Sequence, residues 1–195
     1  MTYRVTEIFY SIQGEGHRAG TPSVFVRFQG CAVESICPIK CDTEYDTGKR
    51  MTAKQIAREV RGYLPNGGSV ILTGGEPLTQ YDNELHLALT PGFTICAETS
   101  GAFVSKAHLD WITISPKVSS TVLRRNFTHA DELKYVLRAG QPLPTPAIDA
   151  DHYFLSPEWD GENTKANIAH CVDLVKANPE EWRLSLQTQK LMGIR

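Results

Sequence analysis

The alternation of short apolar runs with helical patterns constrains the fold of this chain more than any other feature of its sequence. Runs rich in β-branched and aromatic residues predict strands at Val5–Phe9, Ser23–Gln29, Ser69–Leu72, Thr94–Glu98, Trp111–Ser115, Leu133–Leu137, Tyr153–Leu155 and Arg183–Leu186. Helices are expected between some of these runs, at residues 52–64, Pro77–Leu89 and Asn163–Asn178. The first of them is expected to begin with a capping box formed by Thr52 and Gln55. Such alternation predicts parallel strand pairing with right-handed crossovers.

The length of the chain limits how complete such a sheet becomes. A full eight-fold barrel usually takes about 200 to more than 400 residues. This chain has 195, and several connections between predicted strands are too short to hold a helix. We therefore predict an α/β fold, an incomplete (open) TIM-like β/α barrel. No linker or internal repeat divides the sequence, so residues 1–195 are expected to form a single domain.

Charge and hydropathy favour a small-molecule substrate. The chain carries 20 Lys and Arg against 22 Asp and Glu, a formal net charge of −2. Without a strong positive field, recruitment of nucleic acid or of an anionic membrane is not expected. No apolar run approaches the ~20 residues that span a bilayer, and the N-terminus lacks a signal pattern, so the cytoplasm is the expected location.

Three of the five cysteines, Cys31, Cys37 and Cys41, are close together directly after the predicted strand Ser23–Gln29. An odd number with three in one loop argues against a disulfide framework and for a metal site. Three thiolates can hold three irons of a 4Fe-4S cluster and leave the fourth iron open. A structural zinc site is the alternative, but zinc usually takes four protein ligands and only three are local. Cys96 and Cys171 are expected to be buried and structural.

A glycine-rich turn, Thr73-Gly74-Gly75-Glu76-Pro77, follows the predicted strand Ser69–Leu72. Glycines let the backbone approach a polar ligand closely, and Glu76 is suited to accept a hydrogen bond from an amino group. Combined with the cysteine loop, this turn indicates radical S-adenosylmethionine chemistry. Other polar residues also stand at or just past the C-terminal ends of predicted strands, where barrel enzymes assemble their active sites: Glu98, Thr99, Ser100, Ser115, Lys117, Ser156 and Gln187.

Seven segments together carry a resemblance to a known family: Glu7–Gly16, Pro22–Cys31, Cys41–Thr43, Ile71–Pro77, Glu98–Gly101, Ile114–Lys117 and Trp182–Thr188. The chain resembles the 7-carboxy-7-deazaguanine synthases, which are radical S-adenosylmethionine lyases. The resemblance covers most of the length, and it implies conversion of 6-carboxy-5,6,7,8-tetrahydropterin to 7-carboxy-7-deazaguanine with loss of ammonia, in queuosine and 7-deazapurine biosynthesis. It also implies an external electron donor such as flavodoxin, and a homodimer.

The resemblance further implies a role for particular residues. Cluster ligation falls to Cys31, Cys37 and Cys41, and Mg²⁺ binding to Thr43. The residues expected at S-adenosylmethionine are Gly74, Gly75, Glu76, Ser100, Ser115, Pro116, Lys117 and Ser156. The residues expected at the pterin are Ile12, Gln13, Gly14, Glu15, Arg27, Thr73 and Gln187.

Several alternatives remain open at the level of sequence. A radical S-adenosylmethionine activase of a glycyl-radical protein, or a non-catalytic scaffold that kept the fold, is an alternative to the synthase. Arg27 is expected to bind the pterin carboxylate, and its alternative is an ion pair with Glu7, Glu15 or Glu98. Thr43 has the alternative of capping its own loop. Two charged residues of one strand face, Glu132 and Lys134, either enter the site or form an exposed pair.

Overall fold

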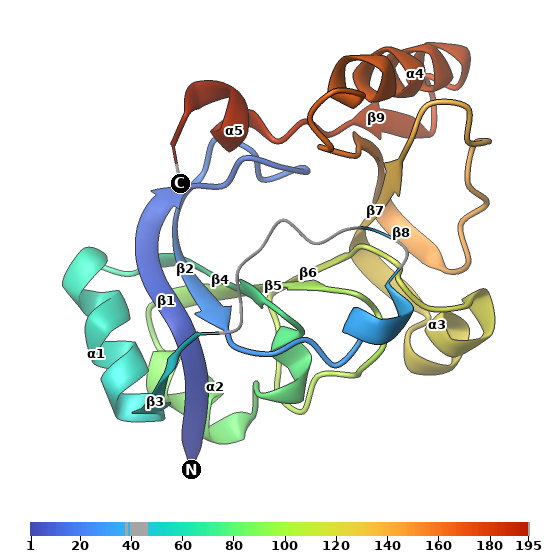
Figure 1. Ribbon diagram of the computed structural model, residues 1–195. Coiled ribbons are helices and arrows are strands. Elements are labelled where there is room, and N and C mark those ends of the chain that lie inside the picture. The colour runs from blue at the N-terminus through green and yellow to red at the C-terminus, as the bar shows by residue number, and fades with distance from the viewer. Residues whose placement is uncertain (38, 40–46, 195) are drawn as a thin grey trace.

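A computed structural model describes residues 1–37, 39 and 47–194, and in this part of the chain nine strands form one sheet. The strands are β1 (Thr2–Ile12), β2 (Pro22–Phe28), β3 (Lys49–Thr52), β4 (Gly68–Gly74), β5 (Phe93–Thr99), β6 (Trp111–Ile114), β7 (His129–Leu137), β8 (Asp149–Pro157) and β9 (Trp182–Leu184). Their order is β3-β1-β2-β4-β5-β6-β7-β8-β9. The sheet curves without closing on itself (Figure 1), so the prediction of an open barrel is confirmed.

The pairing of the first strands differs from the prediction. From β2 to β9 every neighbouring pair is parallel, but β1 is antiparallel to both β2 and β3. The reason is the short connection after β1, which turns back on itself through a bond of 2.9 Å from Gln13 N to Thr21 O. A parallel crossover needs a longer connection. The edge strand β3 was not predicted, because its four residues, Lys49–Thr52, show little apolar character.

Five α-helices cover the described part of the chain: α1 (Ala53–Tyr63), α2 (Asn83–Leu89), α3 (Ser120–Asn126), α4 (Thr164–Ala177) and α5 (Thr188–Met192). The capping box predicted for α1 is present, since Thr52 Oγ1 accepts from Gln55 N at 3.3 Å and Gln55 Oε1 accepts from Thr52 N at 2.8 Å. Short 3₁₀ turns occur at η1 (Glu34–Ile36) and η2 (Pro77–Thr79). Neither α3 nor α5 was predicted, because seven and five residues give too little periodicity.

The prediction of one helix over Pro77–Leu89 is wrong. The segment contains η2 and then α2, with an extended Asp82 between them at φ −146°. The Asp82 carboxylate accepts from Leu85 N at 3.0 Å, so this residue caps a new helix. The side chain of Asp82 therefore caps the start of α2, although the apolar pattern continues across this position.

The two faces of the sheet have different roles. Val24, Val26 and Phe28 of β2 pack in the main core together with residues of α1 and α2. The intervening Phe25 points to the concave face, where its ring stacks on Phe9 with centroids 5.1 Å apart. This alternation also brings Arg27 to the concave face. Among the described residues, no helix is long and apolar enough to cross a membrane.

Candidate functional site

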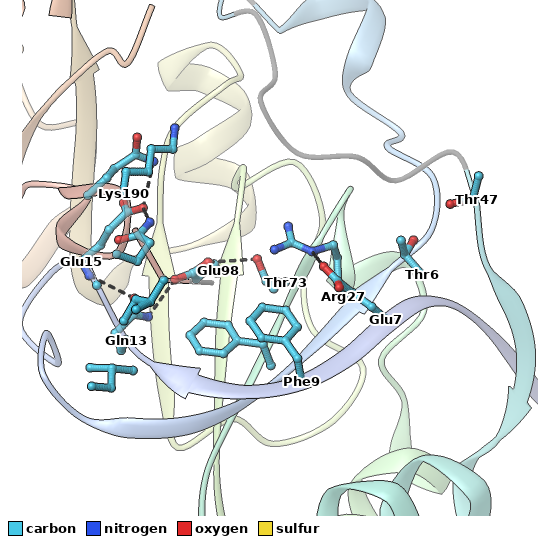
Figure 2. A pocket seen from close by; sticks show the side chains of 16 residues that line it. Thr6, Glu7, Phe9, Gln13, Glu15, Arg27, Thr47, Thr73, Glu98 and Lys190 are labelled. Atoms are coloured by element: carbon cyan, nitrogen blue, oxygen red, sulfur yellow. Dashed lines mark hydrogen bonds and ion pairs between the residues drawn. The ribbon is translucent and has the colours of Figure 1, made fainter. Parts of the chain in front are cut away.

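A cavity of about 570 Å³ opens on the concave face of the sheet (Figure 2); we call it the larger cavity. Residues of β1, β2, β4, β5 and the C-terminal segment line it. All seven residues expected at the pterin are among them: Ile12, Gln13, Gly14, Glu15, Arg27, Thr73 and Gln187. Glu15 and Arg27 lie toward opposite ends of this cavity. The fold thus gathers side chains that are up to 175 positions apart in the sequence (187 − 12).

A carboxylate that was not assigned to the pterin site lies in the middle of the larger cavity. Glu98 accepts from Gln13 Nε2 at 2.9 Å and from Thr73 Oγ1 at 2.9 Å. Strand register could have indicated this, because Leu72 pairs with Ala97 and the next residues, Thr73 and Glu98, are therefore neighbours on the same face. Glu98 is thus held as an acceptor toward the cavity.

Arg27 makes one of the ion pairs that the sequence left open. Its Nε lies 2.8 Å from Oε1 of Glu7, its register partner on β1, and its guanidinium lies over the ring of Phe9 at 5.6 Å. Both charged residues line the larger cavity. The pair with Glu7 fixes the direction of the guanidinium while leaving Arg27 at the cavity surface.

Glu15 forms the other charged end of the cavity. Its carboxylate contacts Lys134 Nζ and accepts from Gln187 Nε2 at 3.0 Å and from Gln189 Nε2 at 3.2 Å. Burial by itself raises the pKa of Glu15, but the Lys134 charge and these hydrogen bonds outweigh burial and lower the pKa.

Glu132 and Lys134 are only 2% and 8% exposed, so the alternative of an exposed pair is wrong.

A smaller cavity of about 190 Å³ adjoins the larger one. Three residues expected at S-adenosylmethionine line it, namely Ser115, Lys117 and Ser156. Within it, Lys117 Nζ donates to Ser115 Oγ at 2.7 Å. Glu15 and Gln187 line both cavities, so these two side chains form a partition between them. Pro116, which was expected at the same ligand, is not a lining residue of either cavity.

The glycine-rich turn lies against the start of the cysteine loop. Gly75 N donates to Phe28 O at 3.1 Å and Glu76 N donates to Gly30 O at 3.3 Å. A Cβ on Gly75 would come within 1.8 Å of Gly30 O, so this close approach requires glycine. The turn therefore positions the residue that directly precedes Cys31.

The geometry of Glu76 differs from the expected contact with a ligand amino group. Its side chain is 0% exposed, and its carboxylate accepts from Leu78 N at 3.2 Å, Thr99 Oγ1 at 2.7 Å, Ser100 N at 2.9 Å and Ser100 Oγ. In this structure the carboxylate has no surface for a ligand, since protein donors surround it. Gly74, Gly75, Glu76 and Ser100 line neither cavity.

The described cysteines fall into two groups. Cys31 and Cys37 are partly buried in the loop after β2, and Cys37 lines the smaller cavity. Cys96 and Cys171 are 3% and 0% exposed, which confirms their predicted burial, and burial raises the pKa of Cys171 to about 11. A loop that brings Cys37 beside Ser115 and Lys117 fits a metal cluster next to a bound cofactor. The two other expected metal ligands, Cys41 and Thr43, lie outside the described residues.

Comparison with known proteins gives relatives over the full length. The chain is 40% identical over 196 residues to a 7-carboxy-7-deazaguanine synthase of Bacteroides thetaiotaomicron, with 100% of both chains covered. Proteins of the same name from Caulobacter vibrioides and Burkholderia multivorans are 36% and 37% identical, again over 100% of each chain. No protein-family model matches the chain. The crystal structure of QueE from Escherichia coli superposes with a TM-score of 0.69 and 26% identity, covering 95% of this chain and 94% of that one.

Proposed function

The chain belongs to the 7-carboxy-7-deazaguanine synthase family, and we propose that its larger cavity binds the pterin while its smaller cavity binds S-adenosylmethionine. The protein is a radical S-adenosylmethionine enzyme of queuosine and 7-deazapurine biosynthesis. One observation carries the assignment of the cavities. All seven residues expected at the pterin line one cavity, and Cys37 with three residues expected at the cofactor lines the adjoining one.

The polar groups of the larger cavity match the chemistry of a carboxylated pterin. Arg27 at one end provides a cation for the substrate carboxylate, since a guanidinium binds carboxylates with two parallel hydrogen bonds. The carboxylates of Glu98 and Glu15 provide acceptors for the ring N–H groups. Phe9 and Phe25 supply an apolar surface for the flat ring between these polar ends. Together they fix both the position and the direction of the substrate.

The smaller cavity is suited to hold the cofactor beside the cluster. Cys31, Cys37 and Cys41 would ligate three irons, and the open iron, when S-adenosylmethionine is bound to it, supplies the radical chemistry of the reaction. Ser115, Lys117 and Ser156 would orient the cofactor by hydrogen bonds. The partition of Glu15 and Gln187 would then hold the substrate at a fixed distance from that cofactor.

The remaining parts of the proposal rest on the family resemblance. Thr43 would contribute a hydroxyl to Mg²⁺, a hard cation that also takes water and substrate oxygens as ligands. An external one-electron donor such as flavodoxin would reduce the cluster, and the enzyme would work as a homodimer. Glu76 would act on the smaller cavity indirectly, because its carboxylate accepts from the backbone and side chain of Ser100, and Ser100 O accepts from the backbone N of Lys117 at 3.1 Å.

Anaerobic reconstitution tests this function directly. Cluster-loaded enzyme, supplied with 6-carboxytetrahydropterin, S-adenosylmethionine and a reductant, is expected to form 7-carboxy-7-deazaguanine and ammonia. A non-catalytic scaffold would form neither deoxyadenosine nor product. An activase would cleave S-adenosylmethionine and act only on a protein substrate. Absence of the deazaguanine with a fully loaded cluster would contradict the proposed function.

A further inference from the structure

Lys134 approaches the partition between the two cavities from the cofactor side. Its ammonium contacts Glu15, which lines both cavities, whereas Lys134 itself lines only the smaller one. The side chains of Lys134 and Glu15 are 10% and 14% exposed. Lys134 is on β7, and Glu15 is in the connection after β1, so the pair joins parts of the chain 119 residues apart.

The surroundings of Lys134 are strongly acidic. Burial by itself lowers the pKa of this ammonium, but the charges of Glu15, Glu98 and Glu132 outweigh burial and raise the pKa. Lys134 is therefore a cation across the range in which an enzyme works. Lys134 therefore supplies a positive charge to a poorly solvated region that holds the carboxylates of Glu15, Glu98 and Glu132.

The position of the Glu15 carboxylate is fixed by the donors around it. Lys134 contacts Oε2, while Gln187 and Gln189 donate to Oε1. The backbone adds to this, because Thr188 N and Oγ1 donate to Gly14 O at 3.2 and 2.7 Å. A Cβ on Gly14 would lie 2.9 Å from the backbone N of Gln189, so glycine there permits the contact between this loop and the C-terminal segment. Lys134 brings a positive charge to Glu15, whereas Gln187 and Gln189 are neutral donors.

We propose that Lys134 is a positioning residue for the reaction: it holds the Glu15 carboxylate in place as the anionic acceptor that the pterin ring meets, and so fixes the substrate relative to the cofactor. This inference rests on the proposed function of the larger cavity. Lys134 acts through Glu15 and does not contact the pterin. Its loss therefore weakens pterin binding only while Glu15 is present.

The experiment measures the dissociation constants of the pterin and of S-adenosylmethionine for the cluster-loaded enzyme by equilibrium dialysis without reductant, from pH 6 to 9. The variants are Lys134→Met, Lys134→Arg, Glu15→Gln and the double variant Glu15→Gln/Lys134→Met. The exposed Lys165 of α4 provides the matched control, Lys165→Met. Thermal unfolding of each variant is recorded in parallel, because it reports on a purely structural contribution of the pair.

Lys134→Met is expected to weaken pterin binding about 10- to 100-fold at neutral pH, by analogy with the loss that follows removal of the hydrogen-bonding partner of a metal ligand. Binding of S-adenosylmethionine should change less. Loss of the cation raises the pKa of Glu15, so pterin affinity should fall as the pH falls and recover as the pH rises. Lys134→Arg, which keeps the charge, should stay closer to wild type, and Lys165→Met should bind as wild type does.

The double variant separates positioning from structure. If Lys134→Met fails to fold because the Glu15 carboxylate has lost its cation, the double variant is still testable, since its glutamine at position 15 carries no charge. The proposal requires that Glu15→Gln/Lys134→Met binds the pterin as weakly as Glu15→Gln alone, even where its thermal stability recovers. Recovery of wild-type affinity in the double variant, or a further loss beyond Glu15→Gln, would overturn it. A Lys134→Met enzyme with unchanged affinity and pH profile would also overturn it. Failure of the wild type to make the deazaguanine would instead contradict the proposed function.

Discussion

The Nε atom of Arg27 lies 2.8 Å from Oε1 of Glu7, across the antiparallel pairing of β2 with β1. Their side chains are 21% and 29% exposed, so the pair belongs to the cavity surface and not to the core. An ion pair that water can reach contributes little to stability, and fully exposed pairs commonly contribute up to about 1 kcal/mol. The main effect of the pair with Glu7 is therefore to orient the guanidinium of Arg27, and its contribution to the stability of the fold is small.

Arg27→Lys should weaken pterin binding about 10- to 100-fold while leaving S-adenosylmethionine binding nearly unchanged. The lysine keeps the charge but loses the planar fork that binds a carboxylate through two hydrogen bonds. Titration of each ligand into the variant measures this difference. Glu7→Gln is the control, since it removes the negative charge that pairs with Arg27 and keeps the guanidinium fork. Equal loss of both ligands in Arg27→Lys would mean that the pair with Glu7 has a mainly structural role.

Reconstituted enzyme should hold one 4Fe-4S cluster that depends on the cysteine loop. Replacing Cys31, Cys37 or Cys41 by alanine should abolish the cluster, because three thiolates hold three of its irons. Cys96→Ala and Cys171→Ala should keep it, since these thiols are buried within β5 and α4. Iron and sulfide analysis together with the absorbance spectrum decides between the two groups. A Cys37→Ala protein with a full cluster would show that the ligand assignment is wrong.

Glu76→Ala should lower the free energy of unfolding by about 3 kcal/mol or more, because several donors that now meet one buried carboxylate would lose their acceptor. Urea unfolding of the cluster-free protein measures this loss. Glu84→Ala is the matched control: Glu84 is 52% exposed and pairs with the N-terminus, so its loss should change little. Equal stability of the two variants would contradict the structural role of Glu76.

Turnover should require magnesium, and Thr43 should mediate that requirement. Thr43→Val keeps the shape of the side chain but removes the hydroxyl oxygen that a hard cation needs. Thorough chelation of the wild type is expected to cause a large loss of rate, and Thr43→Val should reproduce that loss even with magnesium present. Unchanged turnover after chelation would refute the magnesium site, whereas an unaffected Thr43→Val would refute only this ligand.

The stability of the fold should depend on pH through His152, whose ring stacks on that of His17 with centroids 3.9 Å apart. Burial lowers the pKa of His152, and the charges of His17 and Arg183 lower it further, against Asp151 and Asp131. The unfolded chain therefore binds the proton more readily than the folded protein. The contribution of His152 to stability should be fully present above a pH of about 6.5, the ordinary pKa of histidine. This contribution should be lost as the pH falls from there towards the lower pKa of the folded protein.

Denaturant unfolding between pH 5 and 7.5 tests this dependence. His152→Gln should flatten the change of stability with pH in that window, because the titrating group is gone. His170→Gln provides a control, since His170 contacts Gln141 O at 2.7 Å and is not among the groups that shift the pKa of His152. A wild-type profile that keeps its slope in His152→Gln would assign the titration to another residue.

Local patterns in the sequence were sufficient to predict where most strands and helices lie. All eight predicted strands overlap observed ones, because period-two alternation and β-branched residues specify an extended backbone over a few neighbouring residues. The capping box of α1 was correct for the same reason, since Thr52 and Gln55 meet within one turn. The break at Asp82 was missed because its capping bond competes with an apolar periodicity that continues on both sides.

The sequence by itself determined eight of the nine described strands, the cysteine loop and the glycine-rich turn, and its family resemblance supplied seven of the residues that gather at the larger cavity. Only the tertiary structure decided that β1 runs antiparallel, that Glu76 is enclosed by protein donors, and that Lys134 meets Glu15. The physical reason is the separation of the partners along the chain. Periodicity and capping act between neighbours, whereas an ion pair across 119 residues exists only once the curved sheet has brought β7 beside the loop after β1.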